Sequence, residues 1–218
     1  MSTDKIQGRI DEIILEYYNR IEALLSICES EIEKIYLLDF IRFFTCQHVA
    51  DWEYSFDGDM PDYGERINYT PIRKDSSLRL WPPPFVIDRI TFRHNVHGVH
   101  FSIIPQFEIK VSEKQTFRVD FAIVGECFEA DQNSFKDVKV IIECDGHEFH
   151  KTPDQIKKDN ERANKMKAQG WVEFRYSGRT IYGENFNAAK DFENYLIEVL
   201  NAKNFGNTIR LENPFQKD

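Results

Sequence analysis

The sequence predicts an α/β domain in which helices pack on a mixed sheet, and three observations support this class. Apolar residues recur at three- and four-residue steps between Ile6 and Cys28, which is the period of an amphipathic helix. Apolar and polar residues alternate over 117–123, and branched aliphatic residues dominate 138–142, so both segments are typical of strands. A helical pattern and a further strand follow Pro153. This order of elements predicts a layered α/β domain.

The N-terminal part of the chain is predicted to be helical. Residues 1–29 form an amphipathic helix whose apolar face suits a protein partner or a second copy of the chain. Ser30 and Glu33 have the spacing of a capping box, which opens a second helix and the main domain, residues 30–203. Between about residues 51 and 98, glycines and prolines interrupt a polar, aromatic-rich stretch, which predicts an irregular insertion.

The second half of the chain carries most of the β pattern. Strands are expected over 86–92, 99–111, 117–123, 138–142 and 171–176, with an interruption of the second of these at Pro105. Helices are expected over 154–169 and 187–202. Pro153 starts the first of these helices and Gly170 ends it. Residues 204–218 are expected to form a C-terminal tail.

Composition and sorting signals place the protein in a broad class. The chain has 218 residues, which suits one domain with elaborations or a small domain with an extension. Its polar, acidic start lacks the apolar run of a signal peptide, and no apolar run approaches the length of a membrane span. The four cysteines are scattered, which favours reduced thiols. We therefore expect a cytoplasmic protein without a membrane segment.

The net charge of -9 argues against a nucleic-acid partner, but its distribution does not. Residues 150–182 hold eight Lys or Arg against four acids, so this segment is +4 and the remainder is -13. Four of these cations fall at spacings of one helical face: Lys157, Lys158, Arg162 and Lys165. The segment predicts either a phosphate-binding face or an ordinary solvated helix surface, and charge alone leaves both open.

Carboxylates at the ends of two predicted strands are the most unusual feature of the sequence. Glu143 and Asp145 follow a buried run and share one face of their strand. Placing acids there is unfavourable unless a cation or hydrogen bonds compensate them. Asp120 lies in the preceding strand and can converge on the same place. Three oxygen ligands suit Mg²⁺, or Mn²⁺ as an alternative, so Asp120, Glu143 and Asp145 are predicted metal ligands.

Several segments, in order, resemble one group of nucleases. They are Ser30 to Glu33, Ile104 to Gln106, Phe117 to Ile123 (FRVDFAI), Ile142 to His150 (IECDGHEFH), Lys158 to Arg162 (KDNER) and Gly170 to Tyr176 (GWVEFRY). Each is a weak signal, but the ordered set, over roughly residues 30 to 180, resembles the PD-(D/E)XK nucleases related to very-short-patch repair endonucleases. In that group the corresponding segments are a first helix, a "PQ" strand, an "RxDFAI" strand, an "EVDG…H" segment and a helix-strand unit.

The resemblance implies a fold and an activity. The fold is a restriction-endonuclease-like core of helix, three-stranded β-meander, helix and strand, here with an N-terminal helical extension and an irregular insertion. The activity is Mg²⁺-dependent hydrolysis of phosphodiester bonds in nucleic acid, most commonly DNA. The alternative is a catalytically silent nucleic-acid-binding module within a repair or defence assembly. By the resemblance, Asp120 and Glu143 are metal ligands, Asp145 is a ligand or orienting acid, and Glu33 is an accessory acid.

One departure from the superfamily pattern bears on mechanism. The Lys of the "(D/E)xK" motif is absent and Asp145 stands in its place, as is common in this subgroup. His150 and His147 are then candidates for assisting deprotonation of water, because imidazole titrates near neutrality. Structural readings also remain open: Glu33 can serve only the helix cap, and Arg162 can pair with neighbouring acids. A zinc site at Cys144 and the two histidines is disfavoured, because Cys144 points away from Glu143 in an extended strand.

Overall fold

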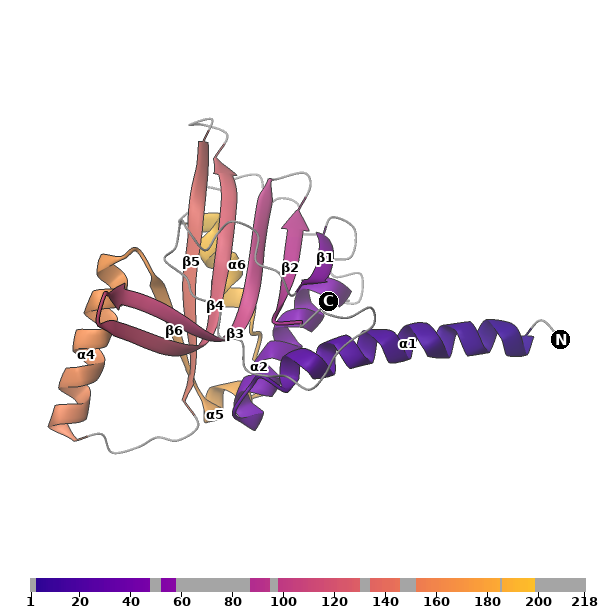
Figure 1. Ribbon diagram of the computed structural model, residues 1–218, viewed down its shortest axis with the longest axis horizontal. Helices are drawn as coiled ribbons and strands as arrows, with labels where there is room; N and C mark the ends of the chain where they lie inside the picture. The colour runs from indigo at the N-terminus through magenta and orange to yellow at the C-terminus, as the bar shows by residue number, and fades with distance from the viewer. Residues whose placement is uncertain are drawn as a thin grey trace, which may run out of the picture.

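A six-stranded mixed sheet in the order β1-β2-β3-β4-β5-β6 organises the chain, as the computed structural model shows (Figure 1). The structure describes residues 3–47, 52–57, 87–94, 98–129, 134–145, 152–184 and 186–198. The strands are β1 (Trp52–Asp57), β2 (Arg89–His94), β3 (Val99–Ser112), β4 (Gln115–Glu129), β5 (Ser134–Asp145) and β6 (Val172–Ser177). Strands β1 to β5 pair antiparallel with their neighbours, whereas β6 pairs parallel to β5. The expected α/β class is confirmed.

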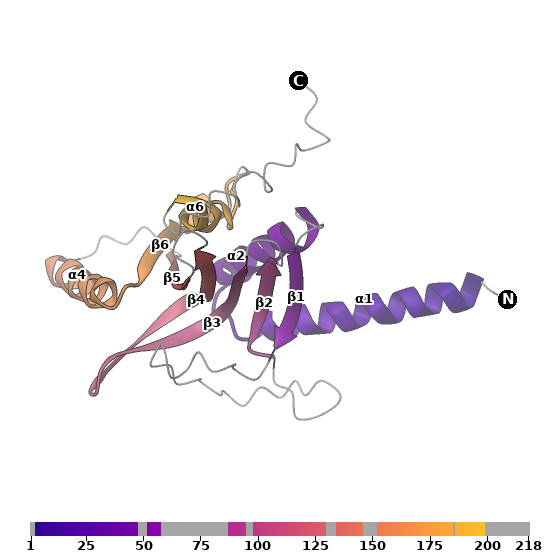
Figure 2. The same cartoon turned by 90° about the horizontal axis from the view of Figure 1, so that it is seen from above.

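Helices cover the two faces of this sheet unequally. They are α1 (Thr3–Leu25), α2 (Glu31–Arg42) with a π-helical continuation (Phe43–Gln47), α4 (Pro153–Ala168), α5 (Gly178–Ile181) and α6 (Lys190–Glu198). On one face, α2, α6 and the end of α1 enclose a large aromatic core that includes Tyr36, Phe40 and Phe192 (Figure 2). On the other face, Met166 of α4 packs with Ile141 and Trp171 in a smaller core.

Local signals in the sequence explain where the main helices start and stop. The Ser30 side chain accepts a hydrogen bond from the backbone N–H of Glu33 at the start of α2. Helix α4 begins at Pro153 behind a capping box of Thr152 and Gln155, and Gly170 follows its end with φ +83°. The predicted starts of both helices and the stop at Gly170 are therefore confirmed.

The insertion and the β-meander differ from the prediction. Residues 52–57, expected to be irregular, form β1, which pairs with β2 over six residues. The antiparallel part of the sheet therefore has five strands, two more than the three-stranded meander that the resemblance implies: β1 was not expected, and β2 corresponds to the strand expected over 86–92. Residues 58–86 of the insertion and the predicted tail, residues 204–218, lie outside the described residues.

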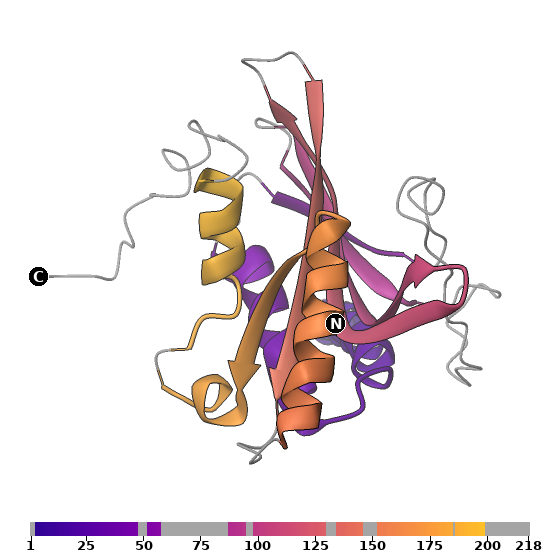
Figure 3. The same cartoon turned by 90° about the vertical axis from the view of Figure 1, so that its left-hand side faces the viewer.

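A bend in β3 and β4 creates the feature on which the site depends. Gln106, directly after Pro105, has φ 51°, and Ile104 and Phe107 both lie in the smaller core although a regular strand would point them to opposite faces. The interruption expected at Pro105 is thus a bend, not a break. Beyond it, the hairpin turns toward α4 (Figure 3), where Lys165 Nζ donates to Gln115 Oε1 at 2.7 Å.

The bend also separates β4 from β5. Their backbone pairing runs from Glu129 and Ser134 to Phe121 and Ile142. Asp120 and Glu143 are the next residues on each strand, so they stand at the fork where the two strands part. The prediction that these residues lie on adjacent strands beside the 154–169 helix is confirmed.

At the other end of the molecule, α1 extends away from the sheet (Figures 1 and 2). Its C-terminal end carries Leu24 into the large core, where this side chain is fully buried. Its earlier turns carry several exposed isoleucines. Among the described residues, no helix has the length and apolarity needed to cross a membrane.

Candidate metal and nucleic-acid site

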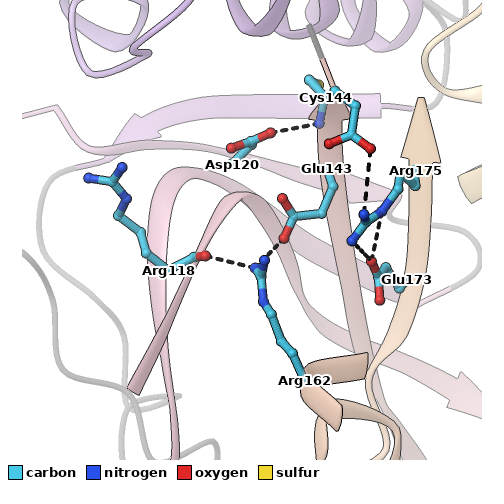
Figure 4. Close-up of polar contacts among 8 residues, drawn as sticks. Arg118, Asp120, Glu143, Cys144, Arg162, Glu173 and Arg175 are labelled. Atoms are coloured by element: carbon cyan, nitrogen blue, oxygen red, sulfur yellow. Dashed lines mark hydrogen bonds and ion pairs between the residues drawn. The ribbon is translucent and has the colours of Figure 1, made fainter. Parts of the chain in front are cut away.

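Asp120 occupies the fork between β4 and β5. Its Oδ2 atom accepts a hydrogen bond of 2.6 Å from the backbone N–H of Cys144 (Figure 4). The carboxylate thus satisfies a donor on β5 that lies past the last β4–β5 backbone pair. Burial is the largest influence on Asp120, and it raises the pKa of this carboxyl to about 6 despite the opposing hydrogen bond from Cys144.

Glu143 lies beside Asp120 on β5 and is buried. It forms an ion pair with Arg162 of α4, whose guanidinium also donates to the backbone carbonyl of Arg118 at 2.8 Å (Figure 4). Burial raises the pKa of Glu143 to about 7, more than the Arg162 charge lowers it, and the charge of Asp120 raises it further. Near neutral pH, Glu143 therefore titrates between its neutral and ionised forms.

Asp145 completes the predicted acidic trio but has a different setting. It is only half-buried, and its Oδ2 atom lies 3.5 Å from Nη1 of Arg175 on β6. Arg175 also donates to Glu173 at 2.7 Å, so it lies between two acids. The parallel register places Arg175 opposite Glu143 and Ser177 opposite Asp145. Asp145 therefore lies at the rim of the fork, next to a cation.

Glu33 connects the first helix of the main domain to the site. It is buried and accepts hydrogen bonds from Ser30 Oγ at 2.7 Å, from the backbone of Glu29 at 2.9 Å and from Gln106 Nε2 at 2.7 Å. Glu33 therefore supports the start of α2, although its backbone donor is Glu29 and not Ser30, the donor that a capping box would use. The contact with Gln106 also ties α2 to the bend in β3, and the charge of Glu33 contributes to the raised pKa of Asp120.

Taken together, four carboxyls influence one another at this fork. The charges of Glu33 and Asp145 both raise the pKa of Asp120, and the charge of Asp120 raises the pKa of Glu143. Arg162 acts on both Asp120 and Glu143 in the opposite direction. Acids that are buried or half-buried and repel one another favour a neighbouring positive charge, and the donor atoms are the hard oxygens that Mg²⁺ prefers.

In the arrangement described, arginines supply this positive charge. Over the described residues, no three His, Cys, Asp or Glu side chains gather into a ready metal site. Glu143 points to Arg162 and Asp145 to Arg175. His147 and His150 lie outside the described residues. Cys144 is buried in the large core on the opposite face from Glu143, as the alternation of the strand predicted.

The predicted basic residues of α4 fall into two groups. Arg162 is half-buried, points into the acidic fork and lies with its guanidinium carbon 5.7 Å from the centre of the Phe117 ring. Lys157, Lys158 and Lys165 are exposed, and Lys165 contacts Gln115 on the hairpin. The structure therefore brings Arg162 to the acids, while the three lysines lie on the solvent side of the same helix.

Three residues near the fork were not predicted as site residues. They are Gln106, which binds Glu33; Arg175, which pairs with Asp145; and Arg118, which pairs with Glu29 at 2.7 Å and whose backbone holds Arg162. All three belong to segments with a motif resemblance, which is the signal that could have singled them out. Their partners depend on strand register, which the sequence does not state.

Comparison with known proteins adds nothing to these contacts, because the chain matches no family model, no curated protein and no solved structure.

Proposed function

We propose that the chain is a metal-dependent endonuclease with a restriction-endonuclease-like core of the PD-(D/E)XK type, acting on nucleic acid, with DNA as the expected substrate. The observation that carries the proposal is the pair of carboxylates at the β4–β5 fork, of which Glu143 is buried and Asp120 is half-buried. Asp120 and Glu143 are held on neighbouring strands, and burial raises the pKa of both. Such a pair is unfavourable for the fold alone, which is typical of functional sites.

The residues at the fork fit a divalent cation. Asp120, Glu143 and the half-buried Asp145 would hold it through carboxylate oxygens, and the neighbouring charge of Glu33 strengthens the attraction for positive charge. When bound, Mg²⁺ or Mn²⁺ would acidify a water and neutralise charge on a phosphoryl group. Binding requires the ionised acids, so affinity should increase as the pH rises through the pKa values of Asp120 and Glu143.

Arg162 is suited to the role of the missing motif lysine. It lies against Glu143, at the place where a phosphate would approach the acids. A guanidinium binds phosphate oxygens as well as carboxylates. We expect the substrate phosphate to take over the Arg162 contact and leave Glu143 free. Lys157, Lys158 and Lys165 lie exposed on the same helix and would hold the flanking phosphates.

A second candidate is a nuclease-fold module that binds nucleic acid without cutting it. The ion pair between Arg162 and Glu143 favours this alternative, because it occupies a predicted ligand. The half-exposed position of Asp145 beside Arg175 favours it in the same way. The two candidates differ in whether Glu143, once released from Arg162, helps to hold a divalent cation that supports cleavage.

The deciding experiment measures metal binding and cleavage in the same proteins. Purified wild type, Asp120→Asn and Glu143→Gln would be incubated with Mg²⁺ or Mn²⁺ and single- or double-stranded DNA or RNA. We expect wild type to cleave nucleic acid. In each variant the cleavage rate should fall at least about 100-fold, which is the usual effect of removing one group that stabilises the transition state electrostatically. Thermal unfolding with and without Mg²⁺ at pH 8 should show stabilisation of wild type only.

A matched control is Asp137→Asn, which removes a carboxylate from the other end of β5, where it pairs with Lys139 at 3.8 Å. This variant should cleave and bind Mg²⁺ like wild type. If Mg²⁺ stabilises wild type but wild type cleaves none of the four substrates, catalysis is rejected and the nucleic-acid-binding module is the function that is retained. Absence of Mg²⁺ and Mn²⁺ stabilisation together with absence of cleavage would reject the nuclease.

A further inference from the structure

The part of α1 that extends from the body carries an apolar stripe on its surface. The stripe comprises Ile6, Ile10, Ile13, Ile14 and Tyr17, which fall within an arc of about 100° at 3.6 residues per turn. The four isoleucines are 43–68% exposed. Tyr17 meets the edge of the sheet, with ring centres 6.2 Å from Tyr54 and 5.8 Å from Phe56. A contiguous exposed apolar surface of this kind marks an interaction site.

Charges along one flank of the stripe indicate what covers it. Arg9, Glu12 and Glu16 are spaced by three and four residues, so they lie on one side of the helix, next to the isoleucines. Arg9 lies toward the N-terminus and the two negative charges lie toward the body, where Arg20 follows on the same flank and pairs with Glu16. This flank is complementary to itself when it is read in the opposite direction.

We propose that α1 packs against α1 of a second copy of the chain in an antiparallel, two-fold symmetric pair. Ile10 of one copy then lies opposite Ile13 of the other, and Ile6 lies opposite Tyr17. Arg9 of each copy faces Glu12 and Glu16 of the other, so the favourable contacts occur twice, as a two-fold interface requires. This inference is independent of the proposed nuclease activity.

The antiparallel direction follows from charge and from the position of the body. In a parallel two-fold pair, the flank on one side of the stripe faces the flank on the other side, so Arg9 would not lie opposite Glu12 and Glu16 of the second copy. A parallel pair would also bring two acidic chains, each of net charge -9, together at one end of the pair. The antiparallel pair places the two bodies at opposite ends. The exposed ion pair of Glu16 with Arg20 within α1 is too weak to prevent sharing of Glu16.

The first test is the mass of the full chain by sedimentation equilibrium over a range of concentrations. We expect a monomer–dimer equilibrium in wild type. Ile10→Asp and Ile13→Asp each place two charges in the symmetric interface and should raise the dissociation constant at least about 100-fold. Leu15→Asp is the matched control, because Leu15 is equally exposed, at 59%, but lies on the opposite face of α1. Circular dichroism would establish that all variants keep their helices.

The second test fixes the direction of the helices. Arg9→Glu and Glu16→Arg should each weaken self-association by about tenfold, because each places like charges opposite one another. An equimolar mixture of the two variants should form a heterodimer about as well as wild type pairs with itself. In that mixture the two substituted side chains face each other with opposite charges, and the Glu16 that the first variant keeps faces the Arg9 that the second variant keeps. A monomeric wild type, equal effects of Leu15→Asp and Ile13→Asp, or no recovery in the mixture would each overturn the proposal.

Discussion

At the β4–β5 fork, buried and half-buried carboxylates repel one another, whereas along the projecting part of α1, isoleucines lie exposed to water. The fork has the large and small cores on either side of it, so Glu143 is buried and Asp120 is half-buried. Among the described residues, the four isoleucines of the α1 stripe lie outside both cores and are exposed. Both regions lower the stability of the isolated chain: the fork removes charged groups from water, and α1 leaves apolar groups in water.

This contrast connects the energetics of the two regions to their ligands. The fork needs positive charge, and in the structure it draws on Arg162 and Arg175. The α1 stripe would be stabilised by an apolar partner. Among the described residues, its aromatic contacts within the chain are those of Tyr17 with Tyr54 and Phe56. Predictions that change charge at the fork should therefore depend on pH, whereas predictions on α1 should depend on protein concentration or helix propensity.

The largest effect on stability is expected from Arg162→Met. This change leaves Glu143 buried without its cation, and breaking such a pair is strongly unfavourable. Because about a quarter of the Arg162 side chain is exposed, we expect a loss of roughly 2–3 kcal/mol in the free energy of unfolding at pH 8. At pH 5.5, Glu143, whose pKa is already about 7, is protonated, and the loss should shrink.

Urea unfolding at the two pH values measures this difference. Lys158→Met is the control, because Lys158 is exposed on the same helix and its removal should change stability by less than about 0.5 kcal/mol. A loss for Arg162→Met that is equal at pH 5.5 and pH 8 would show that its packing on Phe117 matters more than its charge.

An effect of opposite sign is expected from Asp120→Asn. Burial raises the pKa of Asp120 to about 6, so the native state binds a proton more tightly than the unfolded state. Stability of the metal-free wild type therefore falls as the pH rises from about 4 to about 6. The amide carries no charge and still accepts the Cys144 hydrogen bond. Asp120→Asn should stabilise the metal-free protein by roughly 1–2 kcal/mol at pH 8 and less at pH 5.

Differential scanning calorimetry in the presence of a chelator, at pH 5 and pH 8, tests this expectation. Added Mg²⁺ should reverse the order at pH 8, because it stabilises wild type and not the variant. If the variant is less stable than wild type at pH 8 without metal, the carboxylate of Asp120 is a structural hydrogen-bond acceptor and the fork carries no excess of negative charge.

The sequence predicted the parts of this molecule that depend on local chemistry. Capping residues at Ser30 and the helix start at Pro153 marked α2 and α4, because caps act within one turn. The alternation and the branched aliphatic run located β4 and β5 and placed Asp120 beside Glu143. Strand β1 was missed because the alternation of Trp52, Tyr54 and Phe56 is short and precedes a stretch rich in glycine and proline.

The contacts at the site depend on geometry that the sequence does not state. Pro105 predicted an interruption of β3, but the positive φ of Gln106, a residue other than glycine, and the direction of the bend were not predicted. The position of α4 over the hairpin then decides that Arg162 reaches Glu143 on another element. From the sequence, Arg162 was predicted either to bind a phosphate or to pair with neighbouring acids on its own helix. The roles of Asp120, Glu143, Asp145, His150 and Glu33 in catalysis stay predictions.

The smallest expected effect separates helix propensity from packing on α1. Gly8 lies in the projecting part of the helix, and a Cβ at this position meets no atom within 4 Å. It also lies on the face of α1 opposite the apolar stripe. Gly8→Ala should therefore stabilise the helix by about 0.5–1 kcal/mol, because glycine has the greater backbone freedom in the unfolded chain. Amide hydrogen exchange in the first turns of α1 should slow by roughly two- to fivefold, while the urea midpoint of the body stays unchanged.

Gly170 provides the matched control for this prediction. A Cβ at Gly170 also meets no atom within 4 Å, but its φ of +83° is one that side chains disfavour. Gly170→Ala should therefore destabilise the end of α4 by about 1 kcal/mol. The two substitutions add the same methyl group to open space, so an opposite sign isolates backbone conformation as the cause. If Gly8→Ala left hydrogen exchange in α1 unchanged, helix propensity would not limit the projecting part, and its stability would have to come from contacts with a second copy.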